Sequence, residues 1–322
     1  MLSEFFFLSL KIILISLISF FISIVALYFL IPIFRIYLLD KPEKRSSHNT
    51  PKPRGGGITF VLIGCFGSLY LGDSSLIYCL PLAIFSFIDD FKNLSVKKRF
   101  FIQLFTTIFI FLISDFGQNL FLQNFNFFTP IIFLLIIISG IAVINFTNFM
   151  DGIDGLVAGC LSIFLIYYFF SINQTFFLLP LILSLFAFLI FNWSPSKVFM
   201  GDVGSTFLGA LCVLLILKLD SLYNILSYLL ILFPLFGDAF FCVIFRILNR
   251  ENIFQPHKKH LYQKLHQYGW THQKVSIIYI SATLINVLML SVAGLGGIIS
   301  ACIFEIYIGK FLNKKCSKEY KI

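Results

Sequence analysis

The sequence predicts an all-α polytopic membrane protein. Of its 322 residues, 59% are hydrophobic and only 12% are charged, whereas about 25% are charged in ordinary soluble domains. Apolar runs of about 20 residues, the length that crosses a bilayer core, recur with short polar breaks between them. A soluble globular domain needs a charged surface and a disordered chain needs low hydrophobicity, so the composition excludes both.

Eleven apolar segments can cross the membrane, although several are near the lower length limit. The last two flank a glycine-rich stretch, residues 294–297, which could mark a turn or a break inside one helix, so ten crossings remain an alternative. We assign all segments to one integral-membrane domain over residues 1–322. The seven cysteines show no metal-ligand or redox spacing and are interpreted as packing residues. The predicted spans are residues 5–34, 56–72, 75–91, 100–116, 129–147, 155–172, 175–192, 204–219, 223–246, 274–291 and 294–312.

The net charge of +9 lies in the polar breaks, which alternate along the chain between basic and nearly uncharged. By the positive-inside rule the basic breaks are cytoplasmic, which places the N-terminus outside the cell and the C-terminus inside. The cytoplasmic edge of a membrane protein explains this charge better than nucleic-acid binding does. Membrane lipids are therefore expected partners, and nucleic acid is not. The basic breaks are residues 41–54, 92–99, 246–274, 314–321 and the surroundings of Lys197.

Five carboxylates lie at the predicted cytoplasmic ends of the spans, namely Asp89, Asp90, Asp151, Asp154 and Asp202. A single Asp in such a place most often caps a helix or pairs with a nearby Lys. Five of them on one face, interleaved with Gly and Asn, favour a functional site, because ionisable groups within membrane segments are costly. Clustered carboxylates with Asn beside them suit a hard divalent cation such as Mg²⁺.

Glycines beside these carboxylates predict a phosphate site. In the run from Gly201 to Ser205 the loop leads directly into a helix, whose N-terminus attracts phosphate. Lys and Arg in the adjoining loops would hold a multiply charged substrate. The basic loop of residues 40–57 is interpreted either as a stiff connector facing anionic lipids or as part of this site, and its sequence leaves both open.

These segments resemble the polyprenyl-phosphate N-acetylhexosamine-1-phosphate transferases of glycosyltransferase family 4, which include the MraY, WecA and WbpL types. The resemblance covers nearly the whole chain, in the order of the family's motifs. It implies that a sugar 1-phosphate is moved from a UDP-sugar to undecaprenyl phosphate, with release of UMP. The matching segments are Asp40 to Gly57, Asp89-Asp90, Asn145 to Gly155, Phe199 to Ser205 and His257 to His266.

Within that family, the details resemble the WbpL branch of enzymes that initiate O-antigen or other cell-envelope polysaccharides. The run His257-Lys258-Lys259-His260 stands where the MraY type has three histidines. The resemblance implies UDP-activated 6-deoxy sugars such as N-acetylfucosamine or N-acetylquinovosamine, with UDP-N-acetylglucosamine, the substrate of the WecA type, close behind. Phospho-N-acetylmuramoyl-pentapeptide transferase is the alternative within the family.

The motifs and the resemblance together assign roles to the acidic residues. We expect Asp202 to be the main Mg²⁺ ligand, with Mn²⁺ as a substitute ion. Asn148 and Asp151 would complete or orient the metal's ligand shell. Asp89 or Asp90 would orient the lipid phosphate, and one of them could remove its remaining proton.

Asp154 is expected to support this catalytic site, and His257 and His260 are expected to act in it on the diphosphate. Two histidines three residues apart could also bind zinc, but the sequence offers no third soft ligand close to them. The residues expected to bind substrate are Arg45, His48, Lys98, Asn145, Asn148 and Arg246.

The active site is predicted to face the cytoplasm from the inner membrane of a bacterium. An ion-coupled secondary transporter is the main alternative of another class, but its carboxylates should lie near the bilayer midplane rather than at one face. A homodimer is compatible with the sequence, which does not fix the oligomeric state. The predicted active-site loops are approximately residues 40–57, 89–99, 145–155, 193–205 and 247–274.

Overall fold

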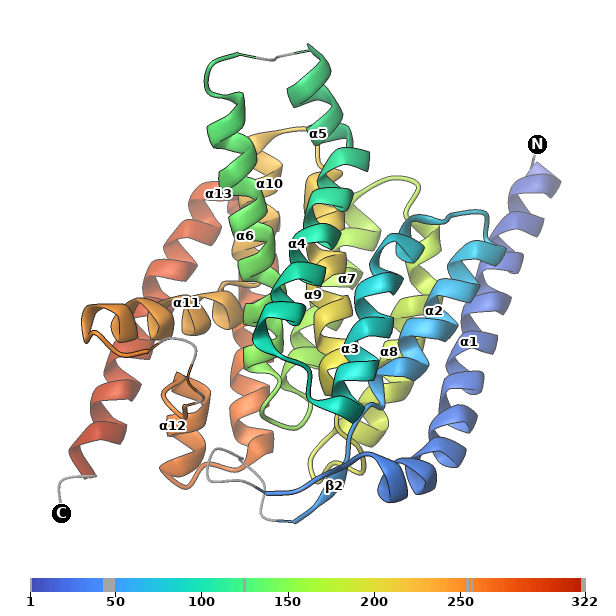
Figure 1. The fold of residues 1–322 in the computed structure, drawn as a ribbon. Coiled ribbons are helices and arrows are strands. Elements are labelled where there is room, and N and C mark those ends of the chain that lie inside the picture. Colours follow the sequence, from blue (N-terminus) through green and yellow to red (C-terminus); the bar gives the residue numbers. More distant parts are fainter. Residues whose placement is uncertain (1, 43–49, 124–125, 253–254, 256, 320–322) are drawn as a thin grey trace.

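The computed structural model is almost wholly helical, as the sequence predicts (Figure 1). It describes residues 2–42, 50–123, 126–252, 255 and 257–319. The elements in chain order are α1 (Leu2–Tyr37), β1 (Leu39–Asp40), β2 (Lys52–Pro53), α2 (Gly57–Tyr70), η1 (Ser75–Cys79), α3 (Leu80–Lys92), α4 (Val96–Ile113), α5 (Asp115–Gln118), η2 (Asn119–Gln123), α6 (Thr129–Met150), α7 (Leu156–Ser171), η3 (Phe176–Leu178), α8 (Leu179–Asn192), α9 (Gly201–Leu217), α10 (Leu222–Ile231), α11 (Phe233–Leu248), α12 (Leu261–Gln267) and α13 (His272–Glu319).

Helix α9 is the centre of the bundle. Every residue from Val203 to Leu217 is buried, as expected of a helix that is apolar on all sides. Helices α2, α3, α4 and α6 pack around it (Figure 1). Because these neighbours enclose α9, the polar residues of its first turn lie where several helices end together.

Glycines allow α9 to approach its neighbours closely. A Cβ atom on Gly57 of α2 would lie 2.5 Å from the Cα of Gly204 in α9, and one on Gly209 would lie 2.7 Å from the Cα of Ile144 in α6. Any side chain at these glycines would push the helices apart. Close backbone contact through small residues is the usual way in which membrane helices pack.

The two short strands close the loop of residues 40–57 at its base. Leu39 pairs with Pro53 and Asp40 with Lys52, in antiparallel order. The tip of this loop, residues 43–49, lies outside the described residues. The strand pair therefore fixes Lys52 and the residues that follow it, up to the start of α2.

Among the described residues, three helices are long and apolar enough to cross a membrane, namely α1, α6 and α13. The bent pairs that begin with α4 and α10 raise this number to five if each pair is one span. Helices α2, α7, α8 and α9 are apolar but have only 10–17 residues, at or below the usual crossing length. The predicted all-α class is confirmed, whereas the count of eleven spans and their orientation stay predictions.

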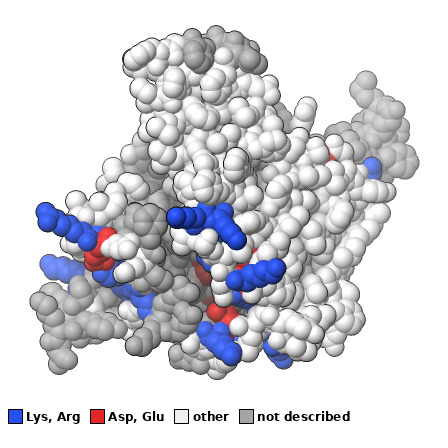
Figure 2. Space-filling view, in the orientation of Figure 1, with Lys and Arg blue, Asp and Glu red and all other residues white. Residues whose placement is uncertain are grey.

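The surface divides into an apolar part and a charged end. Along α1, Tyr28 is 70% exposed and Phe29 65%, as expected of side chains that face lipid rather than water. Lys, Arg, Asp and Glu gather in the lower half of the molecule, whereas the upper part of the same face is almost free of them (Figure 2). The N-terminus lies toward the upper part and the C-terminus at the lower, charged end (Figure 1).

Helix α13 is two antiparallel arms that meet at Gly294. This residue has φ 61° and ψ −153°, which is not helical. Asn286 Nδ2 lies 3.5 Å from Glu305 Oε2, although 19 positions of straight helix would separate them by about 28 Å. The chain therefore reverses at Gly294, which supports the predicted division into spans 274–291 and 294–312. The hydroxyl of Tyr223 accepts a 3.0 Å hydrogen bond from Leu295 N at this turn.

Replacement of Gly294 by Ala should destabilise the protein by about 1–3 kcal/mol, because its backbone conformation is one that essentially only Gly adopts. The new Cβ would also lie 2.9 Å from the Tyr223 hydroxyl. Thermal melting in detergent measures the effect. Gly296→Ala is the matched control, since a Cβ there meets nothing within 4 Å. Equal melting temperatures for the two variants would contradict the reversal.

Candidate active site

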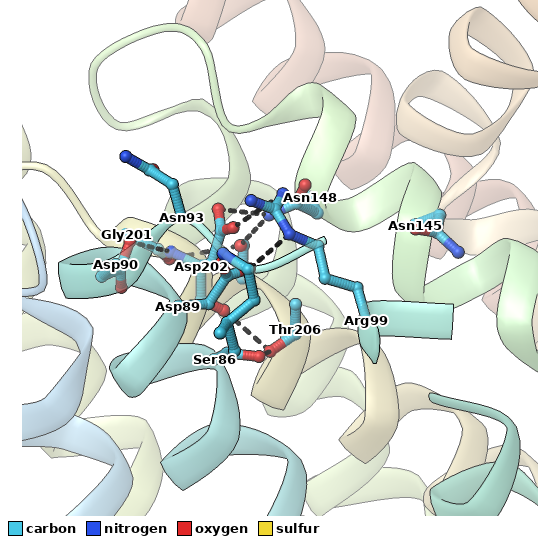
Figure 3. Close-up of polar contacts among 12 residues, drawn as sticks. Ser86, Asp89, Asp90, Asn93, Arg99, Asn145, Asn148, Gly201, Asp202 and Thr206 are labelled. Carbon is cyan, nitrogen blue, oxygen red and sulfur yellow. Dashed lines mark hydrogen bonds and ion pairs between the residues drawn. The ribbon is translucent and has the colours of Figure 1, made fainter. Parts of the chain in front are cut away.

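Polar side chains from three helix ends meet beside the first turn of α9 (Figure 3). Asp89 and Asp90 lie in the last turn of α3, Asp202 lies in the first turn of α9, and Asn148 lies in the last turn of α6. These segments are more than 50 residues apart along the chain. The structure thus brings together four of the residues that the sequence predicts for one site, and Asp151 follows directly after α6.

Asp90 holds the beginning of α9. Its carboxylate accepts hydrogen bonds from the backbone N–H groups of Asp202, at 3.1 Å, and Val203, at 3.2 Å. The first N–H groups of a helix have no partner within the helix, so an acceptor at this place stabilises the helix start. Arg54 Nε lies 3.8 Å from the same carboxylate. Gly201 has φ +77°, and a Cβ there would lie 2.7 Å from Asp90 Oδ2, so this close approach requires glycine.

Arg99 joins the acidic groups of α3 and α9. Its guanidinium lies 2.5 Å from Asp89 and 3.6 Å from Asp202. Asp89 also accepts a 2.5 Å hydrogen bond from Leu94 N, whereas the other oxygen of Asp202 accepts one of 2.9 Å from Asn148 Nδ2. The side chains of Arg99 and Asp202 are 39% and 33% exposed, while that of Asp89 is 3% exposed. Arg99 and Asp202 are thus more accessible to a substrate than Asp89.

Asp151 lies beside this cluster of carboxylates. Burial raises the pKa of Asp151 well above its usual value, and the neighbouring carboxylates of Asp202, Asp90 and Asp154 raise it further. Repulsion among these carboxylates would fall if a cation lay between them. The local charge therefore favours a bound cation or a basic group at this position.

Asp154 belongs to a separate network that ties four segments together. Its carboxylate accepts two hydrogen bonds from Ser196, at 2.8 and 3.1 Å, and lies 3.4 Å from Lys52 and 3.3 Å from His272. Burial alone would raise the pKa of Asp154, but the hydrogen bonds from His272 and Ser196 and the charge of Lys52 leave it below its ordinary value. Asp154 is therefore an ionised anchor for the surrounding loops.

The predicted histidines lie in a third cluster, around α11 and α12. His260 precedes α12 and is 3% exposed, and its ring stacks on that of His257 at 4.9 Å between centroids. Asp238 of α11 lies 3.8 Å from His260 Nδ1 and accepts hydrogen bonds from the N–H groups of Leu261 and Tyr262. No contact between these histidines and the Asp202 cluster is found among the described residues.

Comparison with known proteins supports the family that the motifs suggest. Residues 74–220 match the model of glycosyl transferase family 4. The chain is 31% identical over 290 residues to the probable undecaprenyl-phosphate N-acetylglucosaminyl 1-phosphate transferase of Bacillus subtilis, covering 82% of this chain and 81% of that protein. This chain belongs to glycosyl transferase family 4.

Two further relatives carry another name within the same family. The chain is 28% identical to the phospho-N-acetylmuramoyl-pentapeptide-transferases of Staphylococcus haemolyticus and Petrotoga mobilis. The first alignment covers 76% of this chain and 87% of the relative, and the second covers 86% and 97%. The glycosyl transferase family 4 assignment thus extends over most of the chain, including the segments that supply Asp89, Asn148 and Asp202.

The other substrate-binding residues predicted from the sequence lie in different surroundings. Lys98 is exposed in the first turn of α4, next to Arg99. Asn145 is bound to Gln103 through two side-chain hydrogen bonds, of 2.8 and 3.2 Å, and lies apart from Asp202 in Figure 3. The guanidinium of Arg246 is buried against Glu251 at 3.3 Å and the carbonyl of Gln255 at 3.1 Å, where it holds the following loop.

Two predicted residues, Arg45 and His48, lie outside the described residues. The sequence places Arg99 and Arg54 in basic breaks, and Arg54 also in the matching segment Asp40 to Gly57, but assigns neither residue to the site. In this glycosyl transferase family 4 chain, both guanidinium groups lie against the paired carboxylates of α3.

The oxygen-rich groups of this site fit Mg²⁺, which prefers carboxylate ligands and substrate phosphates. Asp202 offers a partly exposed carboxylate, and Asp151 lies in the same field of negative charge. The amide nitrogen of Asn148 donates a hydrogen bond to Asp202, and this bond orients the carboxylate. The donor set is hard and contains no sulfur, which disfavours soft metals at this place.

Replacement of Asp154 by Asn should lower the melting temperature, because it leaves the largely buried Lys52 without its anionic partner. Loss of one member of a buried ion pair costs about 3–5 kcal/mol. Thermal unfolding in detergent tests this, with the exposed Asp115→Asn as a control of equal chemistry. A variant that melted like the parent protein but lost activity would instead assign Asp154 to substrate contact.

Proposed function

We propose that this chain transfers an N-acetylhexosamine 1-phosphate from a UDP-sugar to undecaprenyl phosphate and releases UMP. The observation that carries the proposal is the convergence of Asp89, Asn148 and Asp202 with Arg99 at four helix ends. The printed names of the relatives, an undecaprenyl-phosphate N-acetylglucosaminyl 1-phosphate transferase and two phospho-N-acetylmuramoyl-pentapeptide-transferases, support the same type of reaction.

The proposed reaction is a phosphoryl transfer. A phosphate oxygen of undecaprenyl phosphate forms a bond to the phosphorus that carries the sugar. The bond from that phosphorus to the oxygen bridging the two phosphates breaks, and UMP leaves with the electron pair. In such reactions a protein contributes mainly by positioning the two anions and by balancing charge.

On the nucleotide side, Asp202 is the accessible group. Asn148 holds one oxygen of Asp202, and the other oxygen is directed toward Arg99. Mg²⁺, or Mn²⁺ in its place, would neutralise the charge of the diphosphate when bound. Arg99 can turn from Asp202 to a phosphate oxygen of the acceptor, because a guanidinium pairs with phosphate as readily as with a carboxylate.

On the acceptor side, we assign the lipid phosphate to the end of α3. Asp89 is fixed by Leu94 N and Arg99, and therefore positions that arginine toward an incoming phosphate. The last proton of a phosphate monoester has a pKa of about 6, so at neutral pH most of the acceptor is already ionised. A carboxylate that removes this proton is accordingly helpful but not essential.

The sugar is proposed from the resemblance of the loops to the O-antigen-initiating branch. We propose UDP-N-acetylglucosamine or a 6-deoxy relative as the donor, and the first step of O-antigen or another cell-envelope polysaccharide as the role. The gathering of charge at one end of the molecule supports a site at the cytoplasmic face of a bacterial inner membrane (Figure 2). A transporter is disfavoured, since the carboxylates lie at helix ends rather than midway along broken helices.

Purified protein supplied with undecaprenyl phosphate, Mg²⁺ and a panel of UDP-N-acetylhexosamines should release UMP with one of the sugars. Asp202→Asn should lower this rate by about 10²-fold or more, because it removes the negative charge of the proposed ligand of the Mg²⁺ ion that stabilises the transition state. The exposed Asp220→Asn, at the other end of α9, is the control and should keep full activity. Near wild-type turnover by Asp202→Asn would refute the assignment.

Substitution of the two carboxylates of α3 should affect binding and turnover in different ways. Asp89→Asn loosens Arg99 and should lower kcat for transfer while UDP-sugar binding stays near that of the parent protein. Asp90→Asn removes an acceptor from the first turn of α9 and should weaken UDP-sugar binding by displacing Asp202. Calorimetric binding of the UDP-sugar, beside kinetics with the acceptor varied, separates the two effects. Identical defects in both variants would remove the distinction between donor and acceptor sides.

A further inference from the structure

Three metal-binding side chains lie together at α11 and α12, apart from the carboxylate cluster. Cys242 comes from α11, His257 from the loop that follows, and His260 from the residue before α12. Their ligand atoms, the cysteine sulfur and one ring nitrogen of each histidine, all lie within 4.8 Å of one another. Cys242 and His260 are buried and His257 is half-buried, so two of the three groups are shielded from water.

A second observation at this place is a buried nitrogen without a hydrogen bond. His260 is 3% exposed, and its Nδ1 has no hydrogen-bond partner among the described residues. The nearest carboxylate, that of Asp238, is 3.8 Å away, which is too long for a hydrogen bond. An unsatisfied buried polar atom is costly and rare in native proteins. A small inward movement of the ring toward a metal ion or toward Asp238 would satisfy it.

We propose that Cys242, His257 and His260 bind a Zn²⁺ ion whose fourth position is open to water. Zinc takes sulfur at about 2.3 Å and imidazole nitrogen at about 2.0–2.1 Å in a tetrahedron, which sets its ligand atoms about 3.5 Å apart. The observed cluster needs to contract by about 1 Å to reach that spacing. A thiolate beside two imidazoles favours zinc over Mg²⁺, so this site differs in kind from the oxygen site at Asp202.

The proposed ion would fasten α11 to the loop before α12. Tyr262, in the first turn of α12, donates a 2.9 Å hydrogen bond to the carbonyl of Phe149 near the end of α6. That contact places α12 against the segment that carries Asp151. The ion would therefore steady one wall of the active site, and it gives His257 and His260 a structural role in place of the diphosphate contact expected from the sequence.

Full-length protein purified in detergent with a histidine-free tag, stripped with a chelator and titrated with Co²⁺ tests the site. We expect one Co²⁺ per chain, with the visible bands of a four-coordinate ion and the ultraviolet band of a cobalt–thiolate bond. Cys242→Ser should remove the thiolate band and weaken binding by more than about 10²-fold, which exceeds the loss usual for outer partners of a metal site. Cys302 is buried elsewhere, against the Leu230 carbonyl, so the control variant Cys302→Ser should keep both the thiolate band and the Co²⁺ affinity of the parent protein.

His257→Ala provides a second variant on a half-buried loop residue, where folding is less at risk. It should bind Co²⁺ more weakly and with an altered visible spectrum. Absence of Co²⁺ binding to the parent protein, or a thiolate band that persists in Cys242→Ser, would overturn the proposal. Either result would leave His260 as a structural partner of Asp238. Because these spectra need no substrate, they are independent of whether transferase activity is found.

Discussion

The arrangement of the site depends on how the first turn of α9 is held. The backbone N–H groups of Asp202 and Val203 donate hydrogen bonds to the carboxylate of Asp90, which lies at the end of α3. Because Asp202 lies on that same turn, the interaction that starts the helix also positions the partly exposed carboxylate of Asp202. Two acids this close repel each other, and Arg54 on one side and Arg99 on the other offset that repulsion. Gly201 makes the approach sterically possible.

Sequence reasoning located the acids but not their partners. Asp89, Asp90 and Asp202 stand out because a charge at the end of an apolar run is costly and therefore unusual. Arg99 does not stand out, since it follows Lys98 in a basic run that equally describes a lipid-facing edge. The packing of α3, α4 and α9 decides which of the two neighbouring basic side chains, Lys98 or Arg99, lies against an acidic residue. Neither hydrophobic periodicity nor the number of charges in the sequence contains that information. The lengths of the individual helices were likewise harder to predict from the sequence than the all-α fold class.

Asp151 and Asp154 also show that the sequence does not predict the partners of an acidic residue. Both precede a glycine and lie three residues apart, so the sequence predicts that both belong to one catalytic site, Asp151 in the metal's ligand shell and Asp154 in support of it. The structure gives them opposite electrostatic surroundings, because Asp154 meets Lys52, Ser196 and His272 whereas Asp151 meets mainly other carboxylates. One is a structural anion and the other lies in a field that favours a cation. Cys242 was likewise interpreted as packing, because its histidine neighbours follow only after a loop.

The reversal of α13 has a consequence for the order in which the molecule assembles during synthesis. Helix α12 contacts the final arm of α13, since Lys264 Nζ donates a 2.8 Å hydrogen bond to Asn313 and Gly309 lies near Leu261. Translation delivers residue 313 about 50 positions after residue 264. The wall of the site that carries Tyr262 therefore gains its last contacts only once residues 309–313 have been made, whereas the segments that supply the carboxylates are all synthesised earlier.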